Sequence, residues 1–241
     1  MKLILENEAV AFEKQIYEKS ANVIVSKKRS FEASMGYDGK NVAVLNFASA
    51  SNPGGGVVNG SSAQEESLCR CSTLYYNLTE DFMWKNFYIP HRRAANPIHN
   101  DDLIYTPNVL IFKSDTNYPR LLPENKWKKV NVITCAAPNL RERPSNAFNS
   151  GDENSTVKIS DDELEQIHIK RGRKILETAV ANKNEVVILG AFGCGAFMNN
   201  PEVVARAYKK LIADFKYTFE TIEFAIYCSP RDDFNFRILM L

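Results

Sequence analysis

The sequence has no apolar run near the roughly 20 residues that a membrane-spanning helix requires. Its first residues, MKLILENEAVAFEKQ, contain only a very short apolar run before Glu6, too short for a signal peptide. The five cysteines are an odd number, with no C-x-x-C pair and no companion histidine spacing. This pattern argues against a disulfide framework and a structural zinc site. The absences together predict a soluble, cytoplasmic protein with reduced cysteines and without a structural zinc site. No cofactor is expected.

Neither sign of charge is in excess. Lys+Arg 30 minus Asp+Glu 29 leaves a net charge of +1, which neither favours nor excludes nucleic acid as a partner. Selectivity for an anion must therefore be local. The length of 241 residues and a hydrophobic content of 44% suffice for one large domain with a sizeable core.

A strand, a glycine loop and a helix follow one another twice along the chain. An apolar run at 42–47 leads into glycines at 54–56, and the S-x-x-E pattern at 62–65 is a capping box that opens a helix. A second apolar run at 186–189 leads into GAFGCG, after which Asn200 caps a helix that has proline at its first position. Backbone N–H groups near helix N-termini stabilise anions, so two such loops side by side predict a site for a diphosphate.

The remaining elements are predicted from hydrophobic periodicity and turn residues. One or two helices are expected within Glu6–Lys27, and the helix that begins at the first capping box is expected to continue to Leu78. The other expected elements are strands at 109–112, 130–135 and 222–227, a capped helix from Ser160 to about Asn182, and a polar lid or surface excursion at 141–158. No repeat or linker divides the chain.

Two familiar nucleotide-binding motifs are missing. Gly55 and Gly60 have the spacing of a Walker A motif, but Ser61 stands where the phosphate-binding lysine belongs. A G-x-G-x-x-G motif would need glycine at Asn59 or at Met198. The glycine loops are therefore of another kind.

The spacing of GGG, seven residues and then QEE resembles the signature of the microbial-type poly(ADP-ribose) glycohydrolases of the macrodomain superfamily. The blocks LNFASASNPGGG, AQEESLCRCSTLY, IYTPNVLIFK, ILGAFGCGAFMNNPEVVA and FAIY are similar to that family in its order, from about Val42 to Tyr227. The loop at 139–158 and the stretch at 87–101 match no assigned pattern. The resemblance implies an α/β fold, a three-layer α/β/α macrodomain with a mixed, mostly parallel sheet. Residues 1–241 would form a single domain, with 1–40 as a helical N-terminal extension.

The resemblance also implies roles for individual residues. Glu66 matches the catalytic acid, and Glu65 matches the residue that holds the ribose hydroxyls beside the scissile bond. The other residues implied to bind ADP-ribose are Asn52 at the distal ribose, Gln64, Phe197 against a ribose, and the diphosphate-wrapping segments Gly54, Gly55, Gly56 and Gly193, Cys194, Gly195, Ala196. For the adenine, no single residue can be assigned; an aromatic side chain near the terminal FAIY block is one candidate. The implied protein is a metal-independent monomer that acts on poly(ADP-ribose), with nucleic acid only as an ADP-ribosylated substrate.

The chemistry suits these residue types. Cleavage of a ribosyl C1″–O bond passes through an oxocarbenium-like state, and the departing oxygen needs a proton. A carboxylic acid beside an apolar wall and a diphosphate has a raised pKa, and after it gives up the proton it can activate water.

Each of these residues also has an ordinary structural interpretation. Glu65 sits at the third position of the capping box, and Glu66 in a first helical turn is ordinarily solvated. Asn52 before a proline is typical of a turn, Phe197 of a core, and Cys194 of small-residue packing. The lone histidines His91, His99 and His168 favour surface or structural roles, and His91-Arg92-Arg93 is a short basic patch that could meet a polymer's phosphates. Two other functions stay open: removal of a single ADP-ribose from protein or nucleic acid, and non-catalytic ADP-ribose binding.

Overall fold

The computed structural model describes residues 1–144 and 156–240. A seven-stranded sheet in the order β1-β4-β5-β3-β6-β7-β2 forms its centre. The strands are β1 (Lys2–Ile4), β2 (Asn22–Ser26), β3 (Val42–Phe47), β4 (Leu103–Ile111), β5 (Lys128–Cys135), β6 (Val186–Leu189) and β7 (Thr221–Ala225). Strands β5, β3, β6, β7 and β2 pair in parallel, whereas β4 is antiparallel to both β1 and β5. The mixed, mostly parallel sheet is therefore confirmed.

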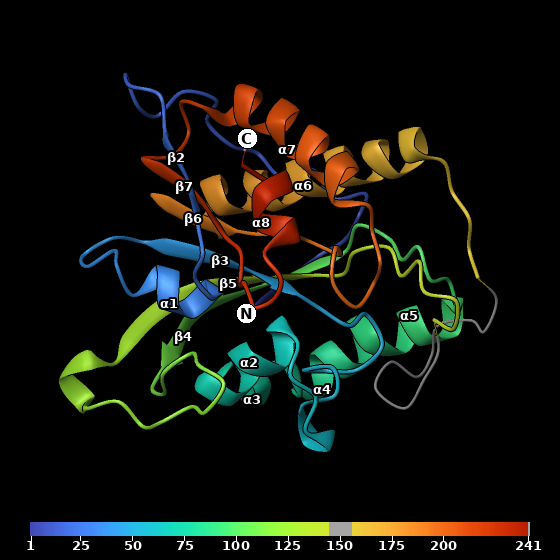
Figure 1. Cartoon of the computed structure of the whole chain (residues 1–241), viewed down its shortest axis with the longest axis horizontal. Coiled ribbons are helices and arrows are strands. Elements are labelled where there is room, and N and C mark those ends of the chain that lie inside the picture. Colours follow the sequence, from blue (N-terminus) through green and yellow to red (C-terminus); the bar gives the residue numbers. More distant parts are fainter. Residues whose placement is uncertain (145–155, 241) are drawn as a thin grey trace.

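Helices cover both faces of the sheet (Figure 1). One layer contains α6 (Asp161–Ala181) and α7 (Pro201–Phe215), with α8 (Phe234–Ile238) beside it. The opposite layer contains α2 (Gln64–Cys71), α3 (Leu74–Leu78), α4 (Asp81–Met83) and α5 (Ile89–Ala94), with the π-helical turn η2 (Trp84–Tyr88) between the last two. The shorter elements are α1 (Ser30–Ser34) and the 3-10 turns η1 (Val57–Asn59) and η3 (Glu124–Lys126). This arrangement confirms the three-layer α/β/α architecture.

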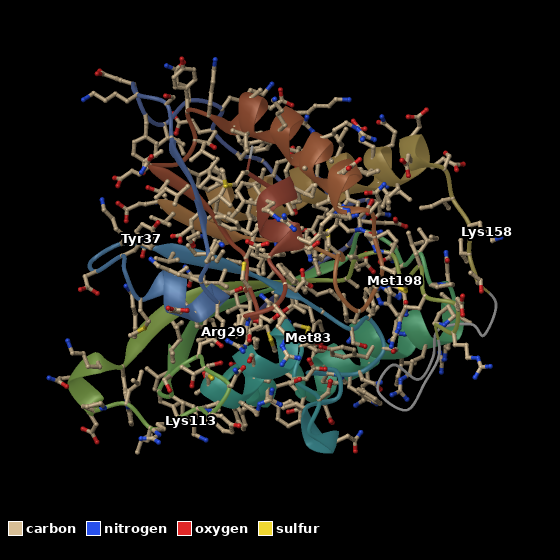
Figure 2. The ribbon with its side chains drawn as sticks, viewed as in Figure 1. Arg29, Tyr37, Met83, Lys113, Lys158 and Met198 are labelled. Carbon is tan, nitrogen blue, oxygen red and sulfur yellow. The ribbon has the colours of Figure 1, made fainter. Side chains whose placement is uncertain are left out.

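The central strand β3 shows why the sheet lies between two layers. Its side chains alternate between the two faces, as in any strand. Ala43 and Leu45 belong to the buried cluster under α6 and α7, whereas Val42 and Val44 belong to the cluster on the α2 side. Side chains fill the space between the sheet and both layers (Figure 2). A continuous apolar run is thus what a strand with two buried faces requires.

The helices expected within Glu6–Lys27 are a wrong prediction. The structure has no regular element between β1 and β2, and the end of this stretch forms strand β2 at the sheet edge. Tertiary contacts replace helical hydrogen bonds here: the amides of Ile16 and Tyr17 both donate to the carbonyl of Tyr217, and Phe12 stacks on Phe215 with 5.5 Å between ring centroids. Residues 1–40 are therefore not a helical extension: they contribute the edge strands β1 and β2, an irregular segment between them and the five-residue helix α1.

Other expected elements differ mainly in their limits. The strand expected at 109–112 begins already at Leu103, because a β-bulge between Thr106 and Val109 accommodates Pro107, which has no N–H for the ladder. The helices capped by Ser160 and by Asn200 form as predicted. Of the polar excursion expected at 141–158, the part at 145–155 lies outside the described residues.

The topology brings four strand ends to one edge of the sheet. Because β5, β3, β6 and β7 are adjacent and parallel, the segments that follow Cys135, Phe47, Leu189 and Ala225 leave from the same side. Both glycine loops are among these segments. In open α/β sheets the carboxyl edge of the strands is where ligands bind.

Candidate active site

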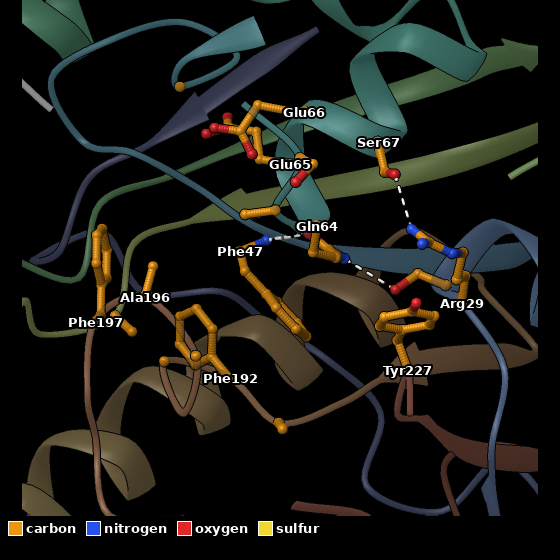
Figure 3. A pocket seen from close by; sticks show the side chains of 18 of the residues that line it. Arg29, Phe47, Gln64, Glu65, Glu66, Ser67, Phe192, Ala196, Phe197 and Tyr227 are labelled. Carbon is orange, nitrogen blue, oxygen red and sulfur yellow. Dashed lines mark hydrogen bonds between the residues drawn. The ribbon is translucent and has the colours of Figure 1, made fainter. Parts of the chain in front are cut away.

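A cavity of about 360 Å³ opens at this edge of the sheet. Its wall combines the segments that follow the four strands with the first turn of α2 and with parts of the N-terminal and C-terminal segments (Figure 3). The lining residues are Arg29, Ser30, Phe47, Ser49, Gly55, Ser61 to Ser67, Asp115, Ala137, Arg141, Ala191 to Gly193, Gly195 to Phe197, Ala225 to Tyr227 and Asn235. The two glycine loops predicted to lie side by side therefore face a common cavity.

Glu65 and Glu66 lie in the first turn of α2 and are 3% and 6% exposed. The Glu65 carboxylate accepts hydrogen bonds from Asn46 Nδ2 at 3.1 Å and from the Ser49 amide at 2.8 Å. Oε1 of Glu66 accepts from the Gly56 amide at 2.9 Å, whereas its Oε2 is buried and has no partner among the described residues. Glu65 is thus held by the protein, while Glu66 keeps one oxygen for a ligand.

The capping box expected at Ser62 to Glu65 is a wrong prediction. Helix α2 begins at Gln64, and its N-cap residue, Ala63, makes no side-chain cap. The Glu65 side chain turns inward, to the end of β3, instead of back to the helix terminus. The helix also stops at Cys71, because Ser72 forms a β-bridge with Ile111, and α3 then starts separately.

The pKa of the Glu65 carboxyl is raised to about 8 by burial, which disfavours its charged form. Hydrogen bonds from Ser49, Asn46 and Gly54 oppose this increase, and the nearby negative charge of Glu66 adds to it. Glu65 therefore keeps a proton at neutral pH.

The free energy of unfolding is expected to fall as the pH rises from about 4.5 to about 8, because of Glu65. In this interval the folded protein binds a proton that the unfolded chain has lost, so higher pH favours unfolding. Urea unfolding of the wild type and of Glu65→Gln at about pH 5 and about pH 8 measures the effect. The variant should gain stability relative to the wild type at the higher pH. A difference between the two proteins that does not change with pH would contradict the raised pKa.

The first glycine loop approaches the two carboxylates closely. Gly55 has a φ of 57°, and a Cβ added to it would lie 2.5 Å from Glu66 Oε1 and 3.1 Å from Glu65 Oε2. The Gly56 amide donates to Glu66, and a hydrogen bond from the Gly54 backbone reaches Glu65. The Gly55 amide donates to the Asn52 carbonyl. The amides of Gly54 and Gly56 therefore bond with the two acids, and that of Gly55 bonds within the loop. None of the three is free to bind a diphosphate.

The second glycine loop has the opposite character. The amides of Gly193, Gly195, Ala196 and Phe197 donate to no residue within the described part of the chain. Gly195 and Ala196 are exposed at the cavity, and a Cβ on Gly195 would meet nothing within 4 Å. An open row of backbone N–H groups is a typical anion site.

Cys194 differs from its neighbours in this loop. Its amide donates to the Ala191 carbonyl, and the residue does not line the cavity. Burial raises the pKa of its thiol to about 12, so the thiolate needed for nucleophilic attack is scarce.

Gln64 and Asn52 are both engaged with the protein. Gln64 lines the cavity, but its Oε1 accepts from the Phe47 amide and its Nε2 donates to Ser30 Oγ and to the Leu45 carbonyl (Figure 3). Asn52 does not line the cavity, and its Oδ1 accepts from Arg92. Both residues therefore hold the end of β3 and the loop after it.

Aromatic rings form one side of the cavity. Phe47 and Phe192 lie 5.6 Å apart between ring centroids, and Phe197 lies 6.1 Å from the ring of His99. Phe197 lines the cavity as the resemblance implied, with Ala196 beside it (Figure 3).

The opposite side of the cavity was not predicted from the sequence. There the guanidinium of Arg29 lies 4.1 Å from the ring centroid of Tyr227 and donates to Ser67 Oγ (Figure 3). Only one sequence feature pointed to Tyr227: it is the aromatic residue that ends the FAIY block. No sequence pattern pointed to Arg29 or to the buried Asp115, because parts of the chain that are distant in sequence bring them together here. Nη1 of Arg29 lies 3.9 Å from Oδ1 of Asp115.

Two broader features concern the described residues only. They contain no group of three His, Cys, Asp or Glu side chains placed to hold a metal ion. None of their helices is both long and apolar enough to cross a membrane.

Comparisons with known proteins agree with this geometry. Residues 6–114 match the family described as microbial-type PARG, catalytic domain. A comparison with curated protein sequences finds no match. Poly(ADP-ribose) glycohydrolase (PARG) from Thermomonospora curvata has a TM-score of 0.83 and 29% identity, over 99% of this chain and 84% of that chain.

Two ligand complexes are also similar. The T. curvata enzyme bound to the inhibitor ADP-HPD has 32% identity and a TM-score of 0.77, over 91% of this chain and 78% of that chain. The Deinococcus radiodurans enzyme in complex with ADP-ribose has 31% identity and a TM-score of 0.75, over 92% and 83%. The chain belongs to the microbial-type poly(ADP-ribose) glycohydrolase family.

Proposed function

We propose that this chain hydrolyses the ribosyl O-glycosidic bonds of poly(ADP-ribose) and releases ADP-ribose, with Glu66 as the general acid and base. The observation that carries this assignment is the buried Oε2 of Glu66, which has no partner in the described part of the chain, at a cavity whose second glycine loop has backbone N–H groups that bond with no described residue. A group that must exchange protons with a substrate needs such an oxygen. The family assignment indicates the reaction, and Glu66 and the second glycine loop are the groups proposed to carry it out.

The proton follows a closed path in this mechanism. Protonated Glu66 gives its proton to the departing glycosidic oxygen while the C1″–O bond breaks. The resulting carboxylate stabilises the oxocarbenium-like ribosyl group and takes a proton from the attacking water, which bonds to C1″. Glu66 is then protonated again, ready for another cycle.

The other residues bind and orient the substrate. Glu65, held by Asn46 and Ser49, accepts or donates hydrogen bonds with the ribose hydroxyls beside the scissile bond. The open amides of the second glycine loop hold the diphosphate, and Phe197 packs against a ribose. At the opposite end, the planar surface of Tyr227 suits the adenine, because aromatic rings stack on one another.

The first glycine loop has a different role from the one expected. It contributes to ADP-ribose binding by holding Glu65 and Glu66 through Gly54 and Gly56. Gln64 and Asn52 act in the same way, through the end of β3 and the loop that follows it.

The substrate is proposed to be poly(ADP-ribose) attached to modified proteins, and residues 1–241 are proposed to act as one monomeric domain. A cytoplasmic location is proposed because all five cysteines are free thiols, as is typical of a reducing compartment.

Release of free ADP-ribose tests the proposed function. The protein is incubated separately with poly(ADP-ribose), with mono-ADP-ribosylated protein and with mono-ADP-ribosylated DNA, and the products are separated by chromatography. We expect free ADP-ribose from the polymer. Release from a singly modified substrate alone would indicate a mono-ADP-ribosyl hydrolase. Binding of ADP-ribose without release from any substrate would indicate a non-catalytic reader.

A further inference from the structure

Asn199 connects three segments directly behind the second glycine loop. It is 2% exposed and begins the turn into α7. Its Nδ2 donates to the Pro138 carbonyl at 2.6 Å and to the Phe197 carbonyl at 3.0 Å, and its amide donates to the Gly193 carbonyl at 3.0 Å. Oδ1 lies 2.8 Å from Nε2 of His168, on α6. One side chain thus joins the segment after β5, the glycine loop and helix α6.

The hydrogen-bond partners determine the orientation of both side chains. Since Pro138 and Phe197 offer only carbonyl oxygens, the NH₂ group of Asn199 must face them, and Oδ1 must face His168. The His168 nitrogen at Oδ1 must then carry the hydrogen. Its Nδ1 is buried without a partner within the described residues. Burial lowers the pKa of His168 to about 4, so the ring is neutral at physiological pH, with the proton on Nε2.

The loop around Asn199 has an unusual backbone. Gly193 has a φ of 81°, and a Cβ added to it would lie 2.8 Å from Asn199 Cγ and 2.7 Å from Ala137 Cβ. Met198, 66% exposed (Figure 2), has a φ of 57°, which long side chains rarely adopt. Such a conformation persists only where the surrounding contacts impose it. The bonds from Asn199 to Gly193 and Phe197 hold both ends of the segment that presents the open amides.

We propose that Asn199, oriented by His168, is the positioning residue that keeps the second glycine loop in its diphosphate-binding shape. This inference rests on the proposed function, in which the loop binds the diphosphate. Neither side chain lines the cavity. Their effect is to align the N–H groups before the ligand arrives, so that binding does not have to order the loop.

Loss of this alignment should weaken binding of the diphosphate specifically. We compare the Kd of ADP-ribose with that of adenosine, which has no diphosphate, for the wild type and for Asn199→Ala by calorimetry or competition. The variant should bind ADP-ribose about 10- to 100-fold more weakly, the range expected for the loss of about one hydrogen bond to a charged group. Its affinity for adenosine should stay within about twofold of the wild type, because adenosine contacts the opposite end of the cavity.

Asn184 provides a matched control. It is also a buried asparagine (3% exposed), and it also joins several segments, through Asn131, Tyr105 and the Ala179 carbonyl. It precedes β6, at the end of the strand opposite to the glycine loop. Asn184→Ala should lose stability but keep its affinity for ADP-ribose. Equal weakening of ADP-ribose binding in both variants would show a general structural effect and overturn the inference.

Substitutions of His168 test the orientation without changing Asn199, and they also serve if Asn199→Ala does not fold. His168→Leu leaves Oδ1 of Asn199 without a donor, so it should weaken ADP-ribose binding and not adenosine binding. His168→Gln carries an N–H group at nearly the position of Nε2 and should restore most of the affinity. Unchanged ADP-ribose affinity in His168→Leu would overturn the role of His168, and in Asn199→Ala it would overturn the whole inference. A wild type that binds ADP-ribose no more tightly than adenosine would instead refute the diphosphate site of the proposed function.

Discussion

Replacement of Glu66 by glutamine is expected to lower kcat for poly(ADP-ribose) by at least about 10²- to 10⁴-fold, the usual contribution of general acid–base catalysis. Glutamine has the size of glutamate, and its carbonyl oxygen can still accept the Gly56 amide as Oε1 does. It has no proton to give to the departing oxygen and takes none from water at neutral pH. The Kd for ADP-ribose should change little, since the ligand's diphosphate is held by the other loop.

The same substitution elsewhere serves as the control. Glu202 lies in the first turn of α7, is exposed and does not line the cavity. Glu202→Gln makes the same substitution in the first turn of another helix and should leave kcat within about twofold of the wild type, as for a surface site without special contacts. If Glu66→Gln cleaves the polymer at a rate comparable to that of the wild type, Glu66 is not the general acid and base.

Gly55→Ala is expected to reduce kcat by about 100-fold, the effect of displacing a catalytic group by about 1 Å. The new methyl group would lie 2.5 Å from Glu66 Oε1, so either the loop or the carboxylate must move. Movement of either one breaks the alignment between the Gly56 amide and Glu66. The positive φ of 57° adds a backbone penalty of about 1–2 kcal/mol for any residue with a Cβ.

Gly60→Ala separates these two effects. Gly60 lies in the same loop with a φ of 78°, but a Cβ there would meet nothing within 4 Å. Thermal unfolding should show a similar loss of stability in both variants, whereas polymer hydrolysis should fall only in Gly55→Ala. If Gly60→Ala were equally inactive, backbone strain in the loop would explain the loss, and close approach to the carboxylates would not.

Local patterns predicted much of the architecture. The apolar runs at 42–47 and 186–189 became adjacent strands with two buried faces, and the caps at Ser160 and Asn200 formed because each depends on residues within one helical turn. The neighbouring carboxylates Glu65 and Glu66 both lie at the cavity. Such patterns predict the structure correctly because the interactions on which they depend join residues that are close in sequence.

The errors share a different cause. The S-x-x-E pattern at Ser62 predicted a cap. Glu65 instead bonds with Asn46 and Ser49, which lie 19 and 16 residues earlier in the chain. The N-terminal segment has helix-forming residues, yet its amides bond with Tyr217, about 200 residues away along the chain. In both cases a long-range partner provided a better hydrogen bond than the local one, and propensity is too weak to prevail against it.

Local sequence patterns specify the two strand–glycine–helix units, their order and the adjacent pair of acids, because each depends on neighbours within a few residues. The different roles of the two glycine loops depend on contacts that form only when the chain folds. The amides of the first loop turn to Glu65 and Glu66, and those of the second stay open, since α2 packs its acids against one loop while Asn199 and His168 support the other. Arg29 and Tyr227 likewise meet only in the folded chain. Direction of an N–H group is a property of three-dimensional contacts, and glycine, which permits almost any direction, leaves that choice to the rest of the fold.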